Sequence, residues 1–238
     1  MKLACVSLAY CEERFVPKFI QSMQDRVTEI VLLNSTHPWN GEAEKDNTAS
    51  IARSLGATVF EHDWPTEEEQ RNTGQEYCSD FDWILTLDPD EFILEEDWVK
   101  LINFLETAEE DAYVCNSQNT LWKNGFIIDP PEDFKQIIAV RPTVRFTDKR
   151  VVDTPWAHAP VDLWHFSWAR TDAEVWRKIN SYGHAHEIDT LGWFSEVWMS
   201  EQTTNLHPLT PEALKKAIRV ELPEELERLD LWPKLRTI

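Results

Sequence analysis

The chain has 238 residues, of which 42% are hydrophobic, and this is enough to bury the core of one large α/β domain. It carries 43 acidic against 23 basic residues, and the resulting net charge of −20 disfavours nucleic-acid binding, which depends on neutralising phosphates with Lys and Arg. The four cysteines lack paired spacing, and neither a signal-peptide pattern nor a run of about 20 apolar residues occurs, so we expect a cytoplasmic protein with reduced thiols and no transmembrane segment.

The first half of the sequence alternates short apolar runs with amphipathic helical patterns, which is typical of a parallel sheet covered by helices. Thr66 with Glu69 has the spacing of a capping box, which marks the start of a helix. Gly56 is suited to end an earlier helix, over 47–55. In chain order we expect a strand over 3–9, a helix over 12–23, a strand over 29–34, a helix over 47–55, a strand over 57–61, a helix over 66–77, a strand over 83–87, a helix over 95–107 and a strand over 111–116.

The second half is less regular. Residues 137–146 predict one or two strands interrupted at Pro142, residues 162–168 predict another strand, and residues 172–182 predict a helix. Two short helices are expected near the end of the chain, over 211–220 and 223–231, each with a proline in its first turn. Because no linker or repeat appears, we expect one compact domain over 1–205, divided near residue 116, with a helical C-terminal extension over 206–238.

Two aspartates, Asp88 and Asp90, directly follow the apolar strand predicted over 83–87. In open parallel sheets, ligands bind at the carboxyl ends of the strands. Paired carboxylates there are suited to Mg²⁺ or Mn²⁺ that bridges the phosphates of a nucleotide. Two loose basic clusters offer further contacts for a small diphosphate: Arg141, Arg145, Lys149 and Arg150, and then Arg170, Arg177 and Lys178. The twelve tryptophans suit stacking on sugar rings, although packing explains most of them.

Several motifs occur together around this pair. Val6-Ser7-Leu8 is followed by Glu12, the run Ile30-Val31-Leu32-Leu33-Asn34-Ser35 forms a second strand, and Arg71-Asn72 precedes Asp82-Trp83-Ile84-Leu85 and Asp88-Pro89-Asp90-Glu91. A second block, Leu163 to Arg170, contains His165 and is followed by Lys178. This combination resembles family 2 glycosyltransferases of the GT-A fold, in particular the bacterial lipopolysaccharide-core type. The first set of motifs covers roughly residues 3–105.

The resemblance implies a metal-dependent glycosyltransferase that moves a sugar from a nucleotide-diphosphate donor to a hydroxyl of a glycan or similar acceptor, with inversion. Residues 1–116 would then bind the nucleotide sugar and residues 117–205 the acceptor. Where the family usually has an acidic residue at the end of the second strand, this chain has Asn34. The resemblance implies Asp88, Asp90 and His165 as ligands of Mn²⁺ or Mg²⁺, and it implies donor contacts from Ser7, Leu8, Glu12, Asn34, Arg71, Asp88 and Lys178.

The catalytic base has no clear match. Inverting transfer needs a carboxylate within hydrogen-bond reach of the acceptor hydroxyl. The related sequences carry a His-Glu pair where this chain has the stretch 156–160, and the nearby candidates are Asp162 and then Asp153, with Glu187 a weaker choice.

Other functions remain open. Glycosylation of a modified base in nucleic acid is one alternative, which the acidic charge disfavours, and a catalytically inactive nucleotide-sugar-binding module is another. A nucleotidyltransferase ranks lower, because residues 9–13 contain no Gly-rich phosphate loop. No feature of the sequence specifies an oligomeric state.

Overall fold

Two sheets form the centre of the computed structural model, which describes residues 1–123, 125–131, 135–200, 204, 206–209 and 215–233. The larger sheet has seven strands in the order β12-β6-β9-β4-β1-β2-β3. Strands β1 to β4 are parallel, whereas β9 runs antiparallel to both β4 and β6. The bounds are β1 Leu3–Ala9, β2 Glu29–Ser35, β3 Thr58–His62, β4 Trp83–Leu85, β6 Ala112–Val114, β9 Ile137–Val140 and β12 Ala157–His158.

The smaller sheet has five strands in the order β14-β8-β7-β13-β5. Strand β5 begins directly after Asp90 and pairs with β13, so that Glu91 lies opposite His165. This pairing brings the two halves of the chain together at the Asp88–Asp90 turn. The bounds are β5 Glu91–Phe92, β7 Ser117–Trp122, β8 Phe126–Asp129, β13 Asp162–Trp168 and β14 Lys216–Arg219, and a separate hairpin is formed by β10 Phe146–Asp148 and β11 Val151–Val152.

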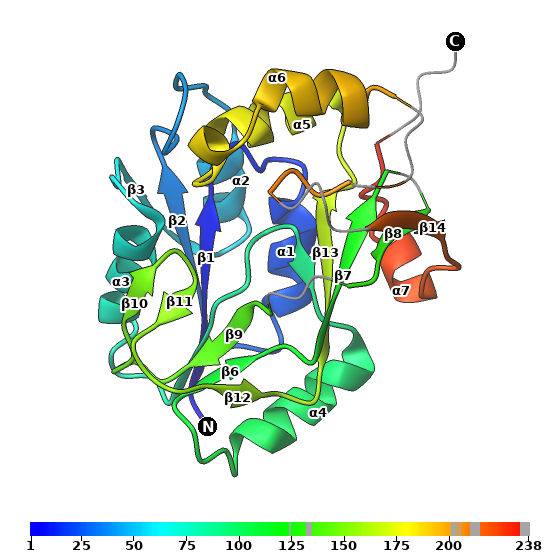
Figure 1. Ribbon diagram of the computed structural model, residues 1–238. Helices are drawn as coiled ribbons and strands as arrows, with labels where there is room; N and C mark the ends of the chain where they lie inside the picture. Colours follow the sequence, from blue (N-terminus) through cyan, green and yellow to red (C-terminus); the bar gives the residue numbers. More distant parts are fainter. Residues whose placement is uncertain (124, 132–134, 201–203, 205, 210–214, 234–238) are drawn as a thin grey trace.

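Helices cover both faces of the larger sheet. Leu3 and Cys5 of β1 join a core cluster with α1 and α4, whereas Ala4 and Val6 join a second cluster with Cys78, just after α3. This alternation is expected of a strand buried on both faces. Helices α5 and α6 lie beyond the carboxyl ends of β1, β2 and β13 (Figure 1). The helices are α1 Val16–Met23, α2 Thr48–Ser54, α3 Glu67–Tyr77, α4 Glu95–Leu105, α5 Asp172–Ser181, α6 Thr190–Trp193 and α7 Glu224–Glu227, with a 3-10 turn over Ala185–Glu187 and a π-helical turn over Phe194–Trp198.

Most predicted elements are confirmed, and the differences lie at their ends. The first helix begins at Val16 rather than at residue 12, because Glu12 forms a turn whose carbonyl accepts from the amides of Phe15 and Val16. The capping interaction of α3 is present, since the Thr66 hydroxyl accepts from the Glu69 amide.

The predicted C-terminal helices are largely wrong. Residues 216–219 form strand β14, which pairs with β8, so pairing with an available sheet edge prevails over local helix propensity. Residues 211–214 of that prediction lie outside the described residues. The second helix is reduced to α7. Within the described part of the chain, no helix is long and apolar enough to cross a membrane.

Candidate functional site

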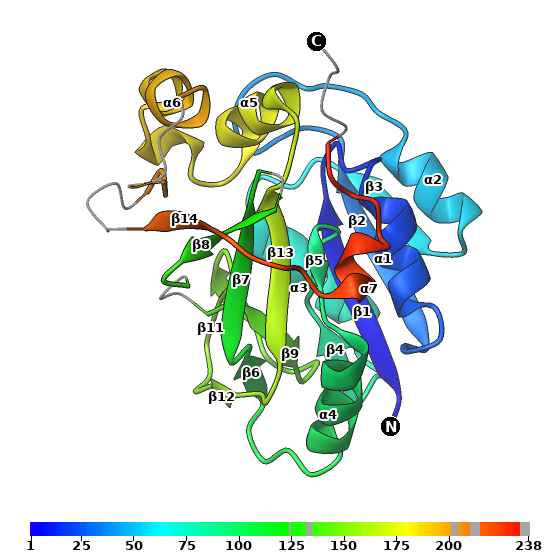
Figure 2. The ribbon, with the colours of Figure 1, turned by 90° about the vertical axis from the view of Figure 1, so that its right-hand side faces the viewer.

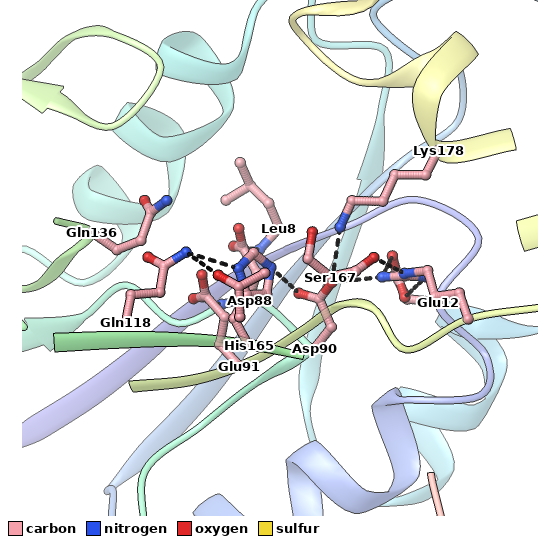
Figure 3. Close-up of polar contacts among 12 residues, drawn as sticks. Leu8, Glu12, Asp88, Asp90, Glu91, Gln118, Gln136, His165, Ser167 and Lys178 are labelled. Carbon is pink, nitrogen blue, oxygen red and sulfur yellow. Dashed lines mark hydrogen bonds and ion pairs between the residues drawn. The ribbon is translucent and has the colours of Figure 1, made fainter. Parts of the chain in front are cut away.

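A cavity of about 670 Å³ lies at the carboxyl ends of β1 and β4. Its wall also includes residues of β7 and β13, the β10–β11 turn and helix α5. The side chains that converge on it form a dense ionic network, part of which is drawn in Figure 3. This is the edge of the sheet at which the sequence predicts a ligand site.

Asp88 is held between two arginines. Its Oδ2 atom lies 3.1 Å from an Arg71 nitrogen and 3.3 Å from an Arg150 nitrogen, and its Oδ1 accepts from the Leu8 amide at 3.4 Å. Burial raises the pKa of Asp88, but the charges of Arg150 and Arg71 outweigh it, so the pKa lies below its ordinary value. The carboxylate is therefore ionised at neutral pH.

Asp90 lies deeper and faces a different set of groups. Its Oδ2 accepts from Arg170 at 2.6 Å and from Lys178 at 3.1 Å, and its Oδ1 lies 3.5 Å from Nε2 of His165. Burial raises the pKa of Asp90, but Lys178, His165 and Arg170 together bring it well below its ordinary value. Arg170 also binds both carboxylate oxygens of Glu12, whose own pKa is raised by burial.

Arg150, named in the sequence analysis only as a member of a loose basic cluster, is a central residue of the site. It is 5% exposed, it lies in the β10–β11 turn, and it binds Glu91 through two nitrogens at 2.6 and 2.7 Å. One of these nitrogens also donates to the Thr86 carbonyl at 2.7 Å, at the end of β4. The bidentate pair fixes the hairpin against the Asp88–Asp90 turn.

Two of the three predicted metal ligands converge. A separation of 3.5 Å between Asp90 Oδ1 and His165 Nε2 is compatible with two neighbouring positions around one ion that binds its ligands at about 2.1 Å. Asp88, in contrast, is directed at Arg71 and Arg150. Among the described residues, no three His, Cys, Asp or Glu side chains together form a metal site. Asp90 and His165 thus fit a cation that completes its shell with phosphate oxygens and water.

The remaining predicted donor contacts divide into two groups. Glu12, Arg71 and Lys178 line the cavity, and so does Leu8, whose amide donates to Asp88. Ser7 is fully buried and Asn34 is half-buried, and neither is part of the cavity wall; the neighbour Ser35 lines it instead. The side-chain oxygens of Ser7 and Asn34 are buried without a hydrogen-bond partner among the described residues.

Neither aspartate predicted as the base lines the cavity. Asp162 lies at the start of β13 and accepts from Asn116 at 3.0 Å, and Asp153 accepts from the Arg145 amide at 3.0 Å beside the β10–β11 hairpin. The sequence reasoning missed Asp148, at the end of β10. Within the described chain, it is the one carboxylate of the cavity wall that has no hydrogen bond or ion pair; the others are Glu12, Glu67, Asp88, Asp90, Glu91 and Glu174.

A solved structure of another protein is similar in fold. A crystal structure of S. aureus TarS 1–349 in complex with UDP-GlcNAc has a TM-score of 0.50 at 13% identity, covering 82% of this chain and 72% of that one. The mannosyltransferase PcManGT from Pyrobaculum calidifontis, in complex with GDP-Man and Mn²⁺, has a TM-score of 0.44 at 12% identity, covering 59% of this chain and 44% of that one.

Sequence comparison gives a further relative and the family. A TPR repeat-containing protein of Synechococcus elongatus is 27% identical over 135 residues, which are 57% of this chain and 31% of the relative. The chain therefore spans about a third of that protein, and it spans 43% of a longer S. aureus TarS chain. The family model described as glycosyl transferase family 2 matches residues 5–172, a stretch that contains Asp88, Asp90 and His165, and the chain therefore belongs to this family.

Proposed function

We propose that the chain transfers a sugar, with inversion, from a nucleotide-diphosphate donor to a hydroxyl of a glycan or similar acceptor, and that the reaction depends on Mn²⁺ or Mg²⁺. Membership of glycosyl transferase family 2 supports the reaction class. The observation that carries the proposal is the convergence of Asp90 and His165 in a cavity at the carboxyl end of the sheet.

Asp90 Oδ1 and His165 Nε2 would hold the cation. When bound, it would offset the negative charge that develops on the leaving diphosphate. Gln118 contacts His165 from the far side of the ring, and Arg170 and Lys178 hold the second oxygen of Asp90, so both ligands are oriented before any donor arrives.

Cationic side chains would add contacts to the diphosphate. Lys178 lies on α5 with its side chain 20% exposed, and it points from the helix toward Asp90 (Figure 3). Arg71 and Arg150 are almost fully buried and hold Asp88. We therefore assign Lys178 to the donor and assign the two arginines to positioning the turn.

The acceptor hydroxyl must lose a proton as it attacks the anomeric carbon, and a carboxylate free to accept that proton is required. Asp148 meets this condition, because it lines the cavity and has no partner in the described chain. We therefore propose Asp148 as the base, with Asp162 and Asp153 as the competing candidates.

Hydrolysis of UDP-GlcNAc and GDP-mannose with and without Mn²⁺ tests the proposal, with Asp90→Ala as the key variant. Without Asp90, the site loses one of its two converging ligands, and we expect turnover to fall by at least about 100-fold. Asp80→Ala, an exposed change outside the cavity, should behave as wild type. Turnover that is independent of metal, or that survives Asp90→Ala, would contradict the proposed mechanism.

A further inference from the structure

The amide of Gln118 lies directly behind His165. Gln118 is on β7, next to β13, and is 3% exposed. Its Nε2 atom is 3.2 Å from Nδ1 of His165, whereas Nε2 of the same ring faces Asp90 Oδ1 (Figure 3). The imidazole is thus held between an amide on one side and a carboxylate on the other.

One atom of this amide lacks a partner. Gln118 Oε1 is buried without a hydrogen bond in the described chain, so no contact to this oxygen fixes the orientation of the amide. A half-turn of the amide exchanges its oxygen and nitrogen, which are nearly identical in shape. After this exchange, Gln118 Oε1 would accept from a proton on Nδ1 of His165. The Thr120 hydroxyl, which lies 3.3 Å from the amide nitrogen before the exchange, could then donate to Oε1 as well.

The two amide orientations select different tautomers of His165. When the amide nitrogen donates to Nδ1, the ring proton must be on Nε2, where it points at Asp90 and blocks metal binding. When the amide oxygen accepts from Nδ1, the proton is on Nδ1, and the lone pair of Nε2 faces the same space as Asp90 Oδ1. Only the second state presents two ligands to one cation.

We propose that Gln118 is a positioning residue that, by the orientation of its amide, sets the tautomer of His165 and thereby the affinity of the site for a divalent cation. This inference rests on the proposed function, because it presumes that Asp90 and His165 bind the cation. Gln118 itself does not touch the cation. It acts through the ring, as the hydrogen-bond partners of metal-bound histidines commonly do.

Two substitutions at the same position separate orientation from packing. Gln118→Leu keeps the size of the side chain, removes the orphaned oxygen and leaves Nδ1 without a partner, so we expect Mn²⁺ affinity to fall about 10- to 100-fold. Gln118→Glu has only acceptor oxygens, so it holds the proton on Nδ1 and should keep the affinity within about threefold of wild type. A side chain that served packing alone would tolerate Leu better than a buried Glu.

The measurement is a titration with Mn²⁺ followed by electron paramagnetic resonance, in the presence of UDP and, separately, of GDP. Gln75→Leu is the matched control, because Gln75 is equally buried but bonds to Arg145 and lies outside the cavity wall. Thermal unfolding shows that each variant is folded before it is titrated.

We expect wild type, Gln75→Leu and Gln118→Glu to bind Mn²⁺ with similar affinity. Gln118→Leu should bind it clearly more weakly. If Gln118→Leu binds Mn²⁺ as tightly as wild type, or Gln118→Glu as weakly as Gln118→Leu, the role of Gln118 is refuted. Asp90→Ala, titrated in parallel, separates this failure from that of the proposed function. If Asp90→Ala weakens binding and Gln118→Leu does not, only the Gln118 inference is wrong, whereas no binding by the wild type overturns both.

Discussion

Asp148 has an unusual position among the acidic residues of the cavity. It directly precedes Lys149 and Arg150 in the β10–β11 turn, and Arg150 is tied to Glu91 and Thr86. The anchored turn fixes the backbone next to Asp148, while its exposed carboxylate is not neutralised by a partner in the described chain. This combination suits a base better than the paired carboxylates around it.

Removing the charge of Asp148 should slow the reaction without weakening donor binding. We expect Asp148→Asn to lower kcat for hydrolysis of the donor, in which water is the acceptor, by about 10²- to 10⁴-fold. Calorimetric titration with UDP should give an unchanged Kd. Asp162→Asn and Asp153→Asn are compared in the same assay, and a large loss in either of them, with Asp148→Asn fully active, would return the role of base to the sequence-based candidates.

At the scale of elements, α3 approaches β1 more closely than a side chain at residue 74 would permit. A Cβ atom built on Gly74 would clash with Val6 and would lie 3.0 Å from Leu33 Cδ1. Because the same helix carries Arg71 to Asp88, this close packing also places the site.

Gly74→Ala should therefore destabilise the fold, by about 1–3 kcal/mol, although alanine is the better helix former. Chemical denaturation measures the difference, and Glu76→Ala, an exposed change in the same helix, serves as the control. A Gly74→Ala protein as stable as the control would show that α3 can shift without cost.

Helix α5 begins with a capping box, in which Glu174 accepts from the backbone of Thr171 and also pairs with Arg14 at 2.7 Å. Burial raises the pKa of Glu174, but the Thr171 amide and Arg14 outweigh it, so the pKa lies below its ordinary value of 4.5. The ionised form therefore stabilises the folded state.

The stability difference between wild type and Glu174→Gln should be about 1 kcal/mol at neutral pH. Since the folded pKa is lowered, the contribution is complete above pH 4.5 and is lost as the pH falls through the folded pKa. Denaturation curves between about pH 7 and about pH 3 measure it. A difference that stays constant over this range would contradict the role of the charge.

These elements also show what the sequence can and cannot predict. Buried strands such as β1 and β4 are recognisable, because an apolar run determines a strand locally, and Thr66 marks the start of α3. The family resemblance then locates Asp88, Asp90 and His165. Asp148 and the ion pairs of Arg150 with Asp88 and Glu91 escape prediction, because both residues come from a short hairpin without periodicity and reach the site only through tertiary contacts. Asp162 lies outside the cavity because it is at the start of β13, and the extended strand carries it away from His165.

At the scale of the whole molecule, the C-terminal segment is packed into the main domain. In Figure 2 it runs from β14, at the edge of the five-stranded sheet, across in front of β7 and β13 to α7. Leu222, Leu226 and Leu231 belong to the same core cluster as α1 and α4, and Trp232 contacts Phe166 with ring centroids 5.4 Å apart. The expected extension over 206–238 thus contributes both a strand and core residues.

Because Leu226 is 1% exposed within that shared core, Leu226→Ala should destabilise the protein as a whole. We expect a loss of about 2–5 kcal/mol, from the lost burial and the cavity that remains. The unfolding transition should stay single when followed by both tryptophan fluorescence and circular dichroism, since the segment and the larger sheet share one core. Leu191→Ala, at a side chain that is 67% exposed, is the control and should change stability little. A separate early transition in Leu226→Ala, with the main transition unchanged, would instead mean that the C-terminal segment folds independently of the domain that carries the site.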